Sequence, residues 1–249
     1  VKETLVGMGF YEALNYSFIA PDWLKAMDYA AGDWRLDPLP VRNPLGEDTS
    51  AMRTTLIPSM LHVLSTNLSR GNADARLFEL STVFKKTEPH ALPEEMPALS
   101  LGMCGEAIDF YALKDAVICL MQRFGIDAAV EPGGEDWMHP GRRAVVRAGN
   151  AQIGGIGEVH PDVAERFGVG SKRLYVADLS LSAMRKAEKP IAQVRALPKF
   201  PAVSRDIALV MDEAVAIGHV IQTIRRAAGK TIEDVKLFDL YRGAQVGAG

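Results

Sequence analysis

The stretch K-F-P-A-V-S-R-D-I-A-L-V occupies residues 199–210, and a second stretch, L-F-D-L-Y-R-G, occupies residues 237–243. The apolar run 207–211 predicts a short, mostly buried strand. Apolar residues recur at helical spacing over 217–228, and two arginines lie in the last turn of this run. Gly229 is a typical C-terminal cap, so we expect a helix there. The run 232–241 returns to a strand pattern, and Arg242-Gly243 begins a turn. This order predicts a β-α-β unit, the first half of a ferredoxin-like βαββαβ domain.

These two stretches resemble the C-terminal anticodon-binding module of the phenylalanyl-tRNA synthetase beta subunit. The resemblance is carried by F-P-x-V-x-R-D-I-A-L at 200–209 and L-F-D-x-Y-x-G at 237–243. The second half of that module, a strand, a helix and a final strand, does not follow, so we expect only its βαβ half. Since the first residue, Val1, is not an initiator Met, we also expect a longer parent protein.

Two side chains of the second stretch are candidates for contacting an anticodon base. Residues two apart on a strand face the same way, and Asp239 and Tyr241 have this spacing. The carboxylate can accept hydrogen bonds from guanine while the phenol ring stacks on the base. The resemblance implies that this pair contacts the first anticodon base. From the residues alone, the alternative is that Tyr241 packs at a strand end and Asp239 caps a turn.

Four basic residues are candidates for binding tRNA phosphates, namely Arg225, Arg226, Lys230 and Arg242. A solvated helix end is an equally good explanation, because Lys and Arg favour that position. Charge does not decide between the two: residues 199–249 carry seven Lys or Arg against six Asp or Glu, and the whole chain has a formal net charge of −3.

The composition is that of an ordinary globular protein, which we expect in the cytoplasm. Of the 249 residues 48% are hydrophobic, but no uninterrupted apolar stretch approaches the roughly 20 residues that cross a bilayer, so neither a transmembrane helix nor a signal peptide is expected. Cys104 and Cys119 are too few for a disulfide framework and form no C-x-x-C pair. We therefore expect buried, reduced thiols.

Residues 1–195 predict an α+β domain with a largely antiparallel sheet. Strand patterns cover 11–18, 75–86, 98–104, 152–159 and 174–181, and helical patterns cover 4–8, 56–68 and 110–124, with further helices beginning at Pro21 and ending at Phe167-Gly168. The charged segment 183–197 leads to Pro198 and is the expected connector. We therefore place the domains at 1–195 and 196–249.

This first domain also resembles the phenylalanyl-tRNA synthetase beta subunit, through G-M-G-F-Y-E-A-L-N-Y-S-F at 7–18, N-P-L-G-E-D-T-S-A-M-R-T-T-L-I-P-S-M-L at 43–61, R-L-F-E-L-S-T-V-F at 76–84 and G-E-V-H-P at 157–161. In that family the region is folded as a class II aminoacyl-tRNA synthetase core without activity and associates with the catalytic alpha subunit. The resemblance implies a non-catalytic member of a heterotetramer, with no cofactor in this chain and with ATP and Mg used by the holoenzyme.

The residues themselves also favour the absence of catalysis. Class II enzymes hold the ATP α-phosphate with an arginine, a fixed cation where charge develops, whereas the corresponding place reads V-F-K-K-T at 83–87. The glycine-rich run 154–158 lacks the second arginine, and we interpret it as a tight turn between strands and not as a phosphate loop. His139 and His160 show no metal-ligand spacing, and no G-x-S-x-G motif occurs.

The predicted helix over 56–68 has a broad apolar stripe with two explanations. Burial inside its own domain is the default for such a stripe. The resemblance assigns part of it to the interface with the alpha subunit. The residues of this stripe are Leu56, Ile57, Met60, Leu61, Leu64 and Leu68.

The sequence therefore favours a non-catalytic part of a phenylalanyl-tRNA synthetase beta subunit, with the alpha subunit and tRNA(Phe) as partners and with no DNA or membrane partner. Two alternatives stay open. A free-standing class II-like ATP-dependent ligase would need phosphate-clamping arginines on the sheet. An assembly scaffold without RNA contact is compatible with the nearly neutral tail.

Overall fold

The computed structural model describes residues 1–88, 91–189, 199–212 and 214–241. The chain forms two compact units, residues 1–192 and 193–249, and each is described here by itself. The predicted domain boundary near residue 195 lies outside the described residues. Across the described part of the chain, no helix is long and apolar enough to cross a membrane.

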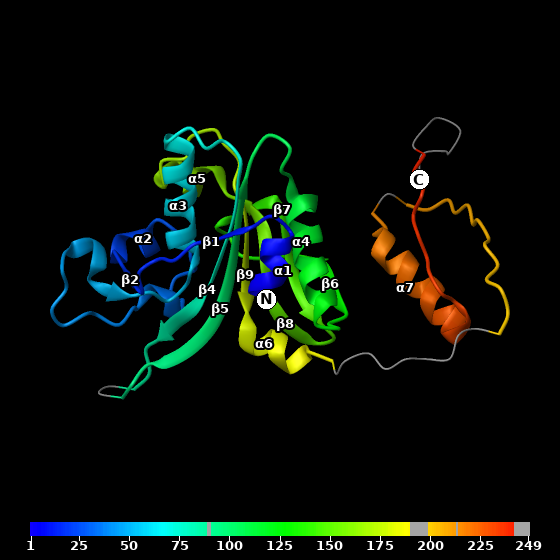
Figure 1. The fold of residues 1–249 in the computed structure, drawn as a ribbon, viewed down its shortest axis with the longest axis horizontal. Coiled ribbons are helices and arrows are strands. Elements are labelled where there is room, and N and C mark those ends of the chain that lie inside the picture. The colour runs from blue at the N-terminus through cyan, green and yellow to red at the C-terminus, as the bar shows by residue number, and fades with distance from the viewer. Residues whose placement is uncertain (89–90, 190–198, 213, 242–249) are drawn as a thin grey trace. The chain divides into compact units, whose positions relative to one another are not determined.

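The first unit is built on one seven-stranded sheet (Figure 1). All neighbouring strands are antiparallel except the edge pair β1 and β4, which is parallel, so the sheet is mixed. The α+β class predicted from the sequence is confirmed. In sheet order the strands are β1 Tyr11–Glu12, β4 Ala75–Lys85, β5 Glu94–Cys104, β9 Tyr175–Ser180, β8 Ala151–Val159, β7 Met138–Ala148 and β6 Ala128–Pro132.

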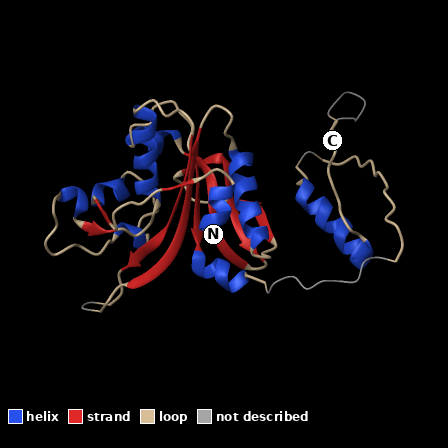
Figure 2. Ribbon diagram, in the orientation of Figure 1, coloured by secondary structure: helices blue, strands red, loops and turns tan. Residues whose placement is uncertain are grey.

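Helices cover both faces of this sheet (Figure 2). The core on one face is completed by α1 Lys2–Gly7, α4 Phe110–Arg123 and α6 Leu181–Ala187. The core on the other face is completed by α3 Ile57–Ser69 and α5 Pro161–Arg166. The small helix α2 Pro21–Lys25, the 3-10 turns η1 Trp34–Leu36 and η2 Glu47–Thr49, and the two-stranded sheet of β2 Phe18–Ile19 and β3 Ala51–Met52 lie between α1 and α3 in sequence.

The central strand β9 shows why the sequence forms this sheet. Tyr175, Ala177 and Leu179 belong to the core under α4, whereas Val176 belongs to the core under α3. Side chains alternate between the faces of a strand, so Asp178 faces the α3 side together with Val176. A strand buried on both faces is a nearly continuous apolar run, and a single carboxylate in it is therefore conspicuous.

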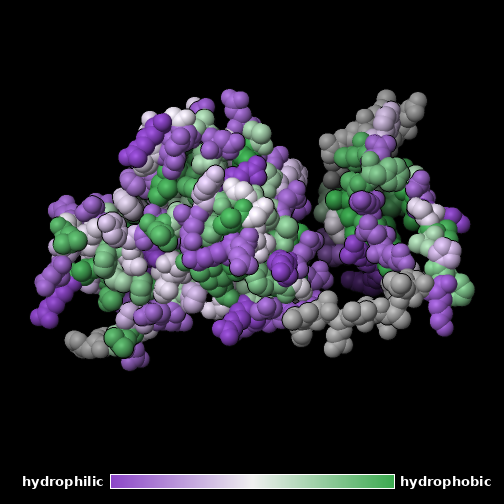
Figure 3. Space-filling model, viewed as in Figure 1, coloured by the Kyte–Doolittle hydropathy of each residue, from purple (hydrophilic) through white to green (hydrophobic). Residues whose placement is uncertain are grey.

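Among residues 199–212 and 214–241 of the second unit there is one α-helix, α7 Ile217–Ala228, which confirms the helix predicted there. Gly229 follows it with a φ of 60° and begins the 3-10 turn η3 Gly229–Thr231. The helix buries none of its residues, and hydrophobic side chains gather on the surface of this unit (Figure 3).

The two strands predicted beside α7 are not present: 207–211 and 232–241 are assigned to no strand. In a split βαβ unit another strand lies between the two parallel strands. Among residues 199–212 and 214–241 no such strand is present, so neither run has a ladder partner, and an isolated strand is not stable in water. The predicted turn at Arg242-Gly243 lies outside the described residues.

Candidate functional site

A cavity of about 720 Å³ opens on the α3 face of the first unit. Its floor consists of β5, β8 and β9, and its walls come from η1 and from the turn before β7. Aromatic, glycine and acidic residues line it, including Trp34, Trp137, Gly154, Gly155, Glu135 and Asp178.

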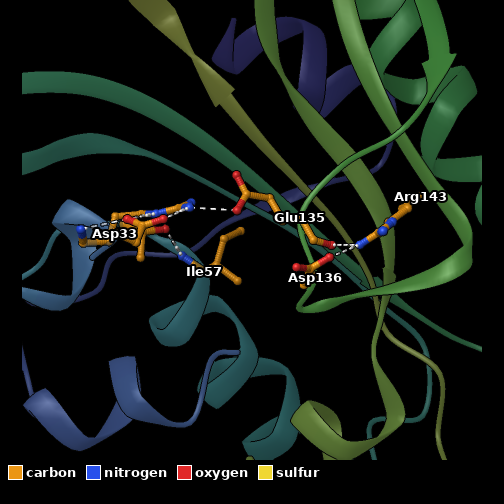
Figure 4. Close-up of polar contacts among 7 residues, drawn as sticks. Asp33, Ile57, Glu135, Asp136 and Arg143 are labelled. Carbon is orange, nitrogen blue, oxygen red and sulfur yellow. Dashed lines mark hydrogen bonds and ion pairs between the residues drawn. The ribbon is translucent and has the colours of Figure 1, made fainter. Parts of the chain in front are cut away.

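The guanidinium of Arg35 is held by two carboxylates at this cavity. Its Nη2 lies 2.6 Å from Asp33 Oδ2 and 2.7 Å from Glu135 Oε2 (Figure 4). Its Cζ lies 4.0 Å from the centre of the Tyr29 ring, a cation–π arrangement. The hydrogen bond from Arg35 lowers the pKa of Asp33. Because both carboxylates neutralise this arginine, it is poorly suited to clamp a phosphate.

Asp178 is a third carboxylate at the same place. Burial raises its pKa to about 6, since desolvation penalises the charged form, and the nearby Arg35 opposes this shift only in part. Burial likewise raises the pKa of the Tyr29 hydroxyl. The cavity therefore carries excess negative charge near neutral pH.

The run 83–87, in which the sequence has no arginine, lies beside this cavity. Val83 lines the cavity, Lys85 Nζ lies 5.7 Å from the centre of the Trp34 ring, and Lys86 Nζ lies 2.9 Å from Asp37 Oδ1. Among the described residues that line the cavity, Arg35 is the one arginine.

The glycine-rich run 154–158 is not the turn that we expected, because it lies inside β8. A Cβ on Gly154 would overlap the Asp178 carbonyl oxygen, and one on Gly157 would lie 2.9 Å from the Arg142 carbonyl oxygen. These glycines permit the close approach of neighbouring strands. Packing explains them without a phosphate.

The two histidines singled out in the sequence stack on each other, with ring centres 6.5 Å apart. His139 Nδ1 accepts a hydrogen bond from the Gly141 amide, and His160 Nδ1 accepts one from the Asp162 amide as the cap of α5. Within the described ranges no group of three His, Cys, Asp or Glu could hold a metal ion.

The apolar stripe of α3 lies in the core of its own unit. Leu56, Ile57, Met60, Leu61 and Leu64 are all fully buried, and only Leu68 is half-buried. Side chains that the sheet already covers are not available to a second subunit. The structure therefore favours the core explanation for these five residues, and a contact of the stripe with the alpha subunit stays a prediction.

Large apolar side chains are instead exposed on the segment 11–16. Tyr11, Leu14 and Tyr16 are 75%, 87% and 80% exposed. The backbone of this segment is nevertheless well anchored: Ala13 N donates to Phe78 O at 2.8 Å.

A buried ion pair also anchors the backbone of the segment 11–16. Arg53 Nη1 lies 2.6 Å from Glu79 Oε1, and both side chains are almost completely buried. Arg53 Nη1 also donates to Tyr16 O at 3.2 Å, and Asn15 Nδ2 donates to Glu79 Oε2 at 2.7 Å. The segment thus presents apolar side chains outward from a fixed backbone.

The predicted tRNA contacts lie in the second unit. Asp239 and Tyr241 are both exposed, Tyr241 by 61%, in an extended run without strand pairing. Arg225 and Arg226 are exposed in the last turn of α7, and Arg225 Nη2 lies 3.7 Å from Asp234 Oδ1. Lys230 lies in η3, and Arg242 lies outside the described residues.

Sequence reasoning missed the residues of the cavity and of the outward segment. Asp33 and Arg35 are neighbours in one turn, but Glu135 and Asp178 belong to two other regions of the chain, and no local spacing links the three regions. A usable signal did exist at Asp178, a carboxylate within the apolar run 174–179. A second signal was the dense set of aromatic residues at 10–18, which we interpreted only as strand character.

Comparison with known proteins covers almost the whole chain. Residues 1–181 match the family model "Phenylalanyl tRNA synthetase beta chain CLM domain", and residues 198–249 match "Ferredoxin-fold anticodon binding domain". Phenylalanine–tRNA ligase beta subunits of Clostridium tetani and Clostridium acetobutylicum are 38% and 35% identical over 252 residues, which is 100% of this chain and 32% of each relative. The chain thus spans about a third of the length of these relatives.

A solved structure shares the fold. The pyrrolysyl-tRNA synthetase of Desulfitobacterium hafniense superimposes with a TM-score of 0.61 at 13% identity, covering 75% of this chain and 67% of that one. This likeness concerns the fold alone and supports a class II synthetase-like architecture. With the family model matching residues 1–181, the chain belongs to the phenylalanyl-tRNA synthetase beta-chain family.

Proposed function

We propose that this chain is a non-catalytic part of a phenylalanine–tRNA ligase beta subunit that acts in the cytoplasm, binds the alpha subunit, and contributes to recognition of the tRNA(Phe) anticodon. The observation that carries the proposal is the match of both family models along one chain, a synthetase-like module followed by an anticodon-binding module. ATP and Mg would be used by the holoenzyme at the alpha subunit, and not at this sheet.

The first step concerns catalysis. A class II site needs fixed cations to stabilise the charge on the transferring group. Here Arg35 is bound by Asp33 and Glu135, and Asp178 adds a further negative group. An ATP triphosphate would therefore meet net negative charge, which argues against the free-standing ligase.

The second step concerns the alpha subunit. We place its contact on Tyr11, Leu14 and Tyr16, because exposed aromatic and aliphatic side chains on an anchored backbone lose little entropy when a partner covers them. Clusters of exposed apolar side chains of this kind mark protein interfaces. The neighbouring Val6 of α1, which is 59% exposed, extends the same region of the chain.

This contact is tested by co-purification of the chain with a phenylalanine–tRNA ligase alpha subunit on size-exclusion chromatography. Leu14→Asp and Tyr16→Asp should abolish co-elution while leaving the circular dichroism spectrum unchanged. Leu92→Asp is the matched control, since Leu92 is equally exposed, at 89%, on the turn between β4 and β5. Co-elution that survives both substitutions would show that the alpha subunit binds elsewhere.

The third step concerns tRNA. Asp239 and Tyr241 are exposed and two residues apart, so a paired strand would present both on one face to a base. In the complete enzyme, Tyr241→Ala and Asp239→Asn should lower kcat/KM for tRNA(Phe) about tenfold or more, since stacking on one base contributes about 1–3 kcal/mol. Glu233→Gln, another exposed acid of this unit, serves as the control. Unchanged aminoacylation would favour the scaffold without RNA contact.

A further inference from the structure

Three buried side-chain polar atoms lack a hydrogen-bond partner among the described residues, namely Tyr29 Oη, Ser100 Oγ and Trp137 Nε1. Buried polar groups are nearly always paired, so each such atom calls for an explanation. All three lie close to the cavity on the α3 face. Trp137 lines the cavity, Tyr29 stacks under the Arg35 guanidinium, and Ser100 lies directly opposite Asp178 in the pairing of β5 with β9.

The register of the sheet brings the polar groups into one row. Glu79, Ser100, Asp178 and Gly155 are successive partners across β4, β5, β9 and β8. Glu79 is paired by Arg53 at one end of this row. At the other end Gly155 lines the cavity, and a Cβ there would be in ordinary van der Waals contact with Met138 Cε at 3.5 Å. Asp178 thus lies between a paired acid and a glycine of the cavity floor.

The charges of the cavity favour a cation as the occupant. Asp33, Glu135 and Asp178 face the guanidinium of Arg35, and Lys85 Nζ lies 5.7 Å from the Trp34 ring at the wall, which leaves an excess of one negative charge when all three carboxylates are ionised. The nearby Asp136 is paired with Arg143 at 2.9 Å and adds nothing to the balance (Figure 4). A metal ion is not favoured, since the described residues contain no cluster of three potential ligands.

The size and the lining of the cavity also restrict the occupant. Trp137 lies in the cavity wall with its Nε1 fully buried, so that this atom does not face the occupant. Trp34, 37% exposed, offers an aromatic face at the cavity wall. A volume of about 720 Å³ lies within the range of small-molecule sites.

We propose that this cavity binds a small organic cation, in which a primary ammonium group pairs with Asp178 and Glu135 and an apolar body packs against Trp34. The site is independent of both partner contacts proposed above. The ligand proposed for the cavity of the first unit is positively charged, whereas ATP is negatively charged.

Protonation of Asp178 should weaken this binding. The groups around Asp178 are Arg35 from η1, Tyr29, Thr55 before α3, Glu135 from the turn before β7, and Ser100 opposite it on β5. With a pKa of about 6, about one carboxyl in ten is ionised at pH 5, so affinity should fall about tenfold between pH 7.5 and pH 5.

The test is isothermal titration calorimetry of the whole chain with 2-phenoxyethylamine, which carries an ammonium, an ether oxygen and one ring. The isosteric neutral 2-phenoxyethanol is the comparison ligand. We expect saturable binding of the amine at about millimolar concentration, the range for a ligand of this size, and at least tenfold weaker binding of the alcohol.

Two variants make the result specific to the site. Asp178→Asn preserves shape and should weaken amine binding at least tenfold, and Gly155→Val should block the floor without touching a charged group. Asp162→Asn, an exposed acid of α5, should bind like the parent chain. The proposal is overturned if the amine does not saturate, if the alcohol binds as tightly, or if Asp178→Asn binds unchanged.

Discussion

Replacing Arg53 by Leu should destabilise the first unit more than any surface substitution. The guanidinium donates to Glu79, to Thr82 O at 2.9 Å, to Tyr16 O at 3.2 Å and to Ser81 Oγ, all in a place where its side chain is 1% exposed. Removing one partner of a buried ion pair leaves an uncompensated charge and costs about 3–5 kcal/mol. With a urea m-value of about 2 kcal/mol/M, the unfolding midpoint should fall by roughly 1.5–2.5 M.

Intrinsic fluorescence is a suitable assay, because all three tryptophans, Trp23, Trp34 and Trp137, lie in the first unit. Urea unfolding is followed for the parent chain, Arg53→Leu, Glu79→Gln and the double variant. The two single losses should not add, since both remove the same pair, and the cycle gives the coupling energy.

Arg147→Leu provides the control, because Arg147 Nε lies 3.2 Å from Glu131 in an exposed pair that should contribute less than about 1 kcal/mol. A loss for Arg53→Leu no larger than this control would refute the reasoning. It would mean that the segment 11–16 is held by its backbone hydrogen bond to Phe78 and not by the buried ion pair.

Three further outcomes are expected. Asp178→Asn should stabilise the chain at pH 8 by about 1–3 kcal/mol in urea unfolding. Each unit of the pKa increase of Asp178 from 3.8 to about 6 corresponds to about 1.4 kcal/mol, and the sum is discounted for partial exposure of the side chain. Below about pH 4 the carboxyl is protonated in both the folded and the unfolded state, so the gain in stability should disappear there. Gly154→Ala should cost about 1–3 kcal/mol by the same assay, since its Cβ would overlap the Asp178 carbonyl oxygen, whereas Gly155→Ala should cost less because its nearest neighbour is a flexible methyl group. Arg226→Ala in the complete enzyme should weaken tRNA binding, measured by filter binding. The slope of log affinity against log salt concentration should decrease in magnitude by about 0.7–0.9, as expected for one lost phosphate contact. An unchanged slope would show that Arg226 contacts solvent and not a phosphate.

Periodicity predicted the elements that carry one clear pattern. The helices over 56–68 and 110–124 appear as α3 and α4 within a residue or two, and the runs 75–86 and 152–159 appear as β4 and β8. It missed β6 and β7; the latter contains His139, Pro140, Gly141 and three arginines, which interrupt its strand pattern. The aromatic run 11–18 forms only the two-residue strand β1 and the beginning of β2, since its side chains point to solvent.

The residues of the cavity could not be predicted from the sequence for a different reason. Its polar residues come together through the register of β5, β9 and β8, and that register depends on contacts far apart in the chain. The same holds for the tail, where local patterns predicted strands over 207–211 and 232–241. Neither run is a strand, because a strand also requires a neighbour that propensity cannot supply.

The position of β9 has a consequence for how the first unit is made during synthesis. β4 and β5 form one hairpin and β6, β7 and β8 form a second group from contacts local in sequence, but β9 lies between them and is the last strand of the sheet to be synthesised. Pairing Met103 with Tyr175 closes a loop of about 70 residues. Until residues 175–180 leave the ribosome, the nascent chain carries two sheet fragments with open inner edges, which are the edges most prone to pair with another chain.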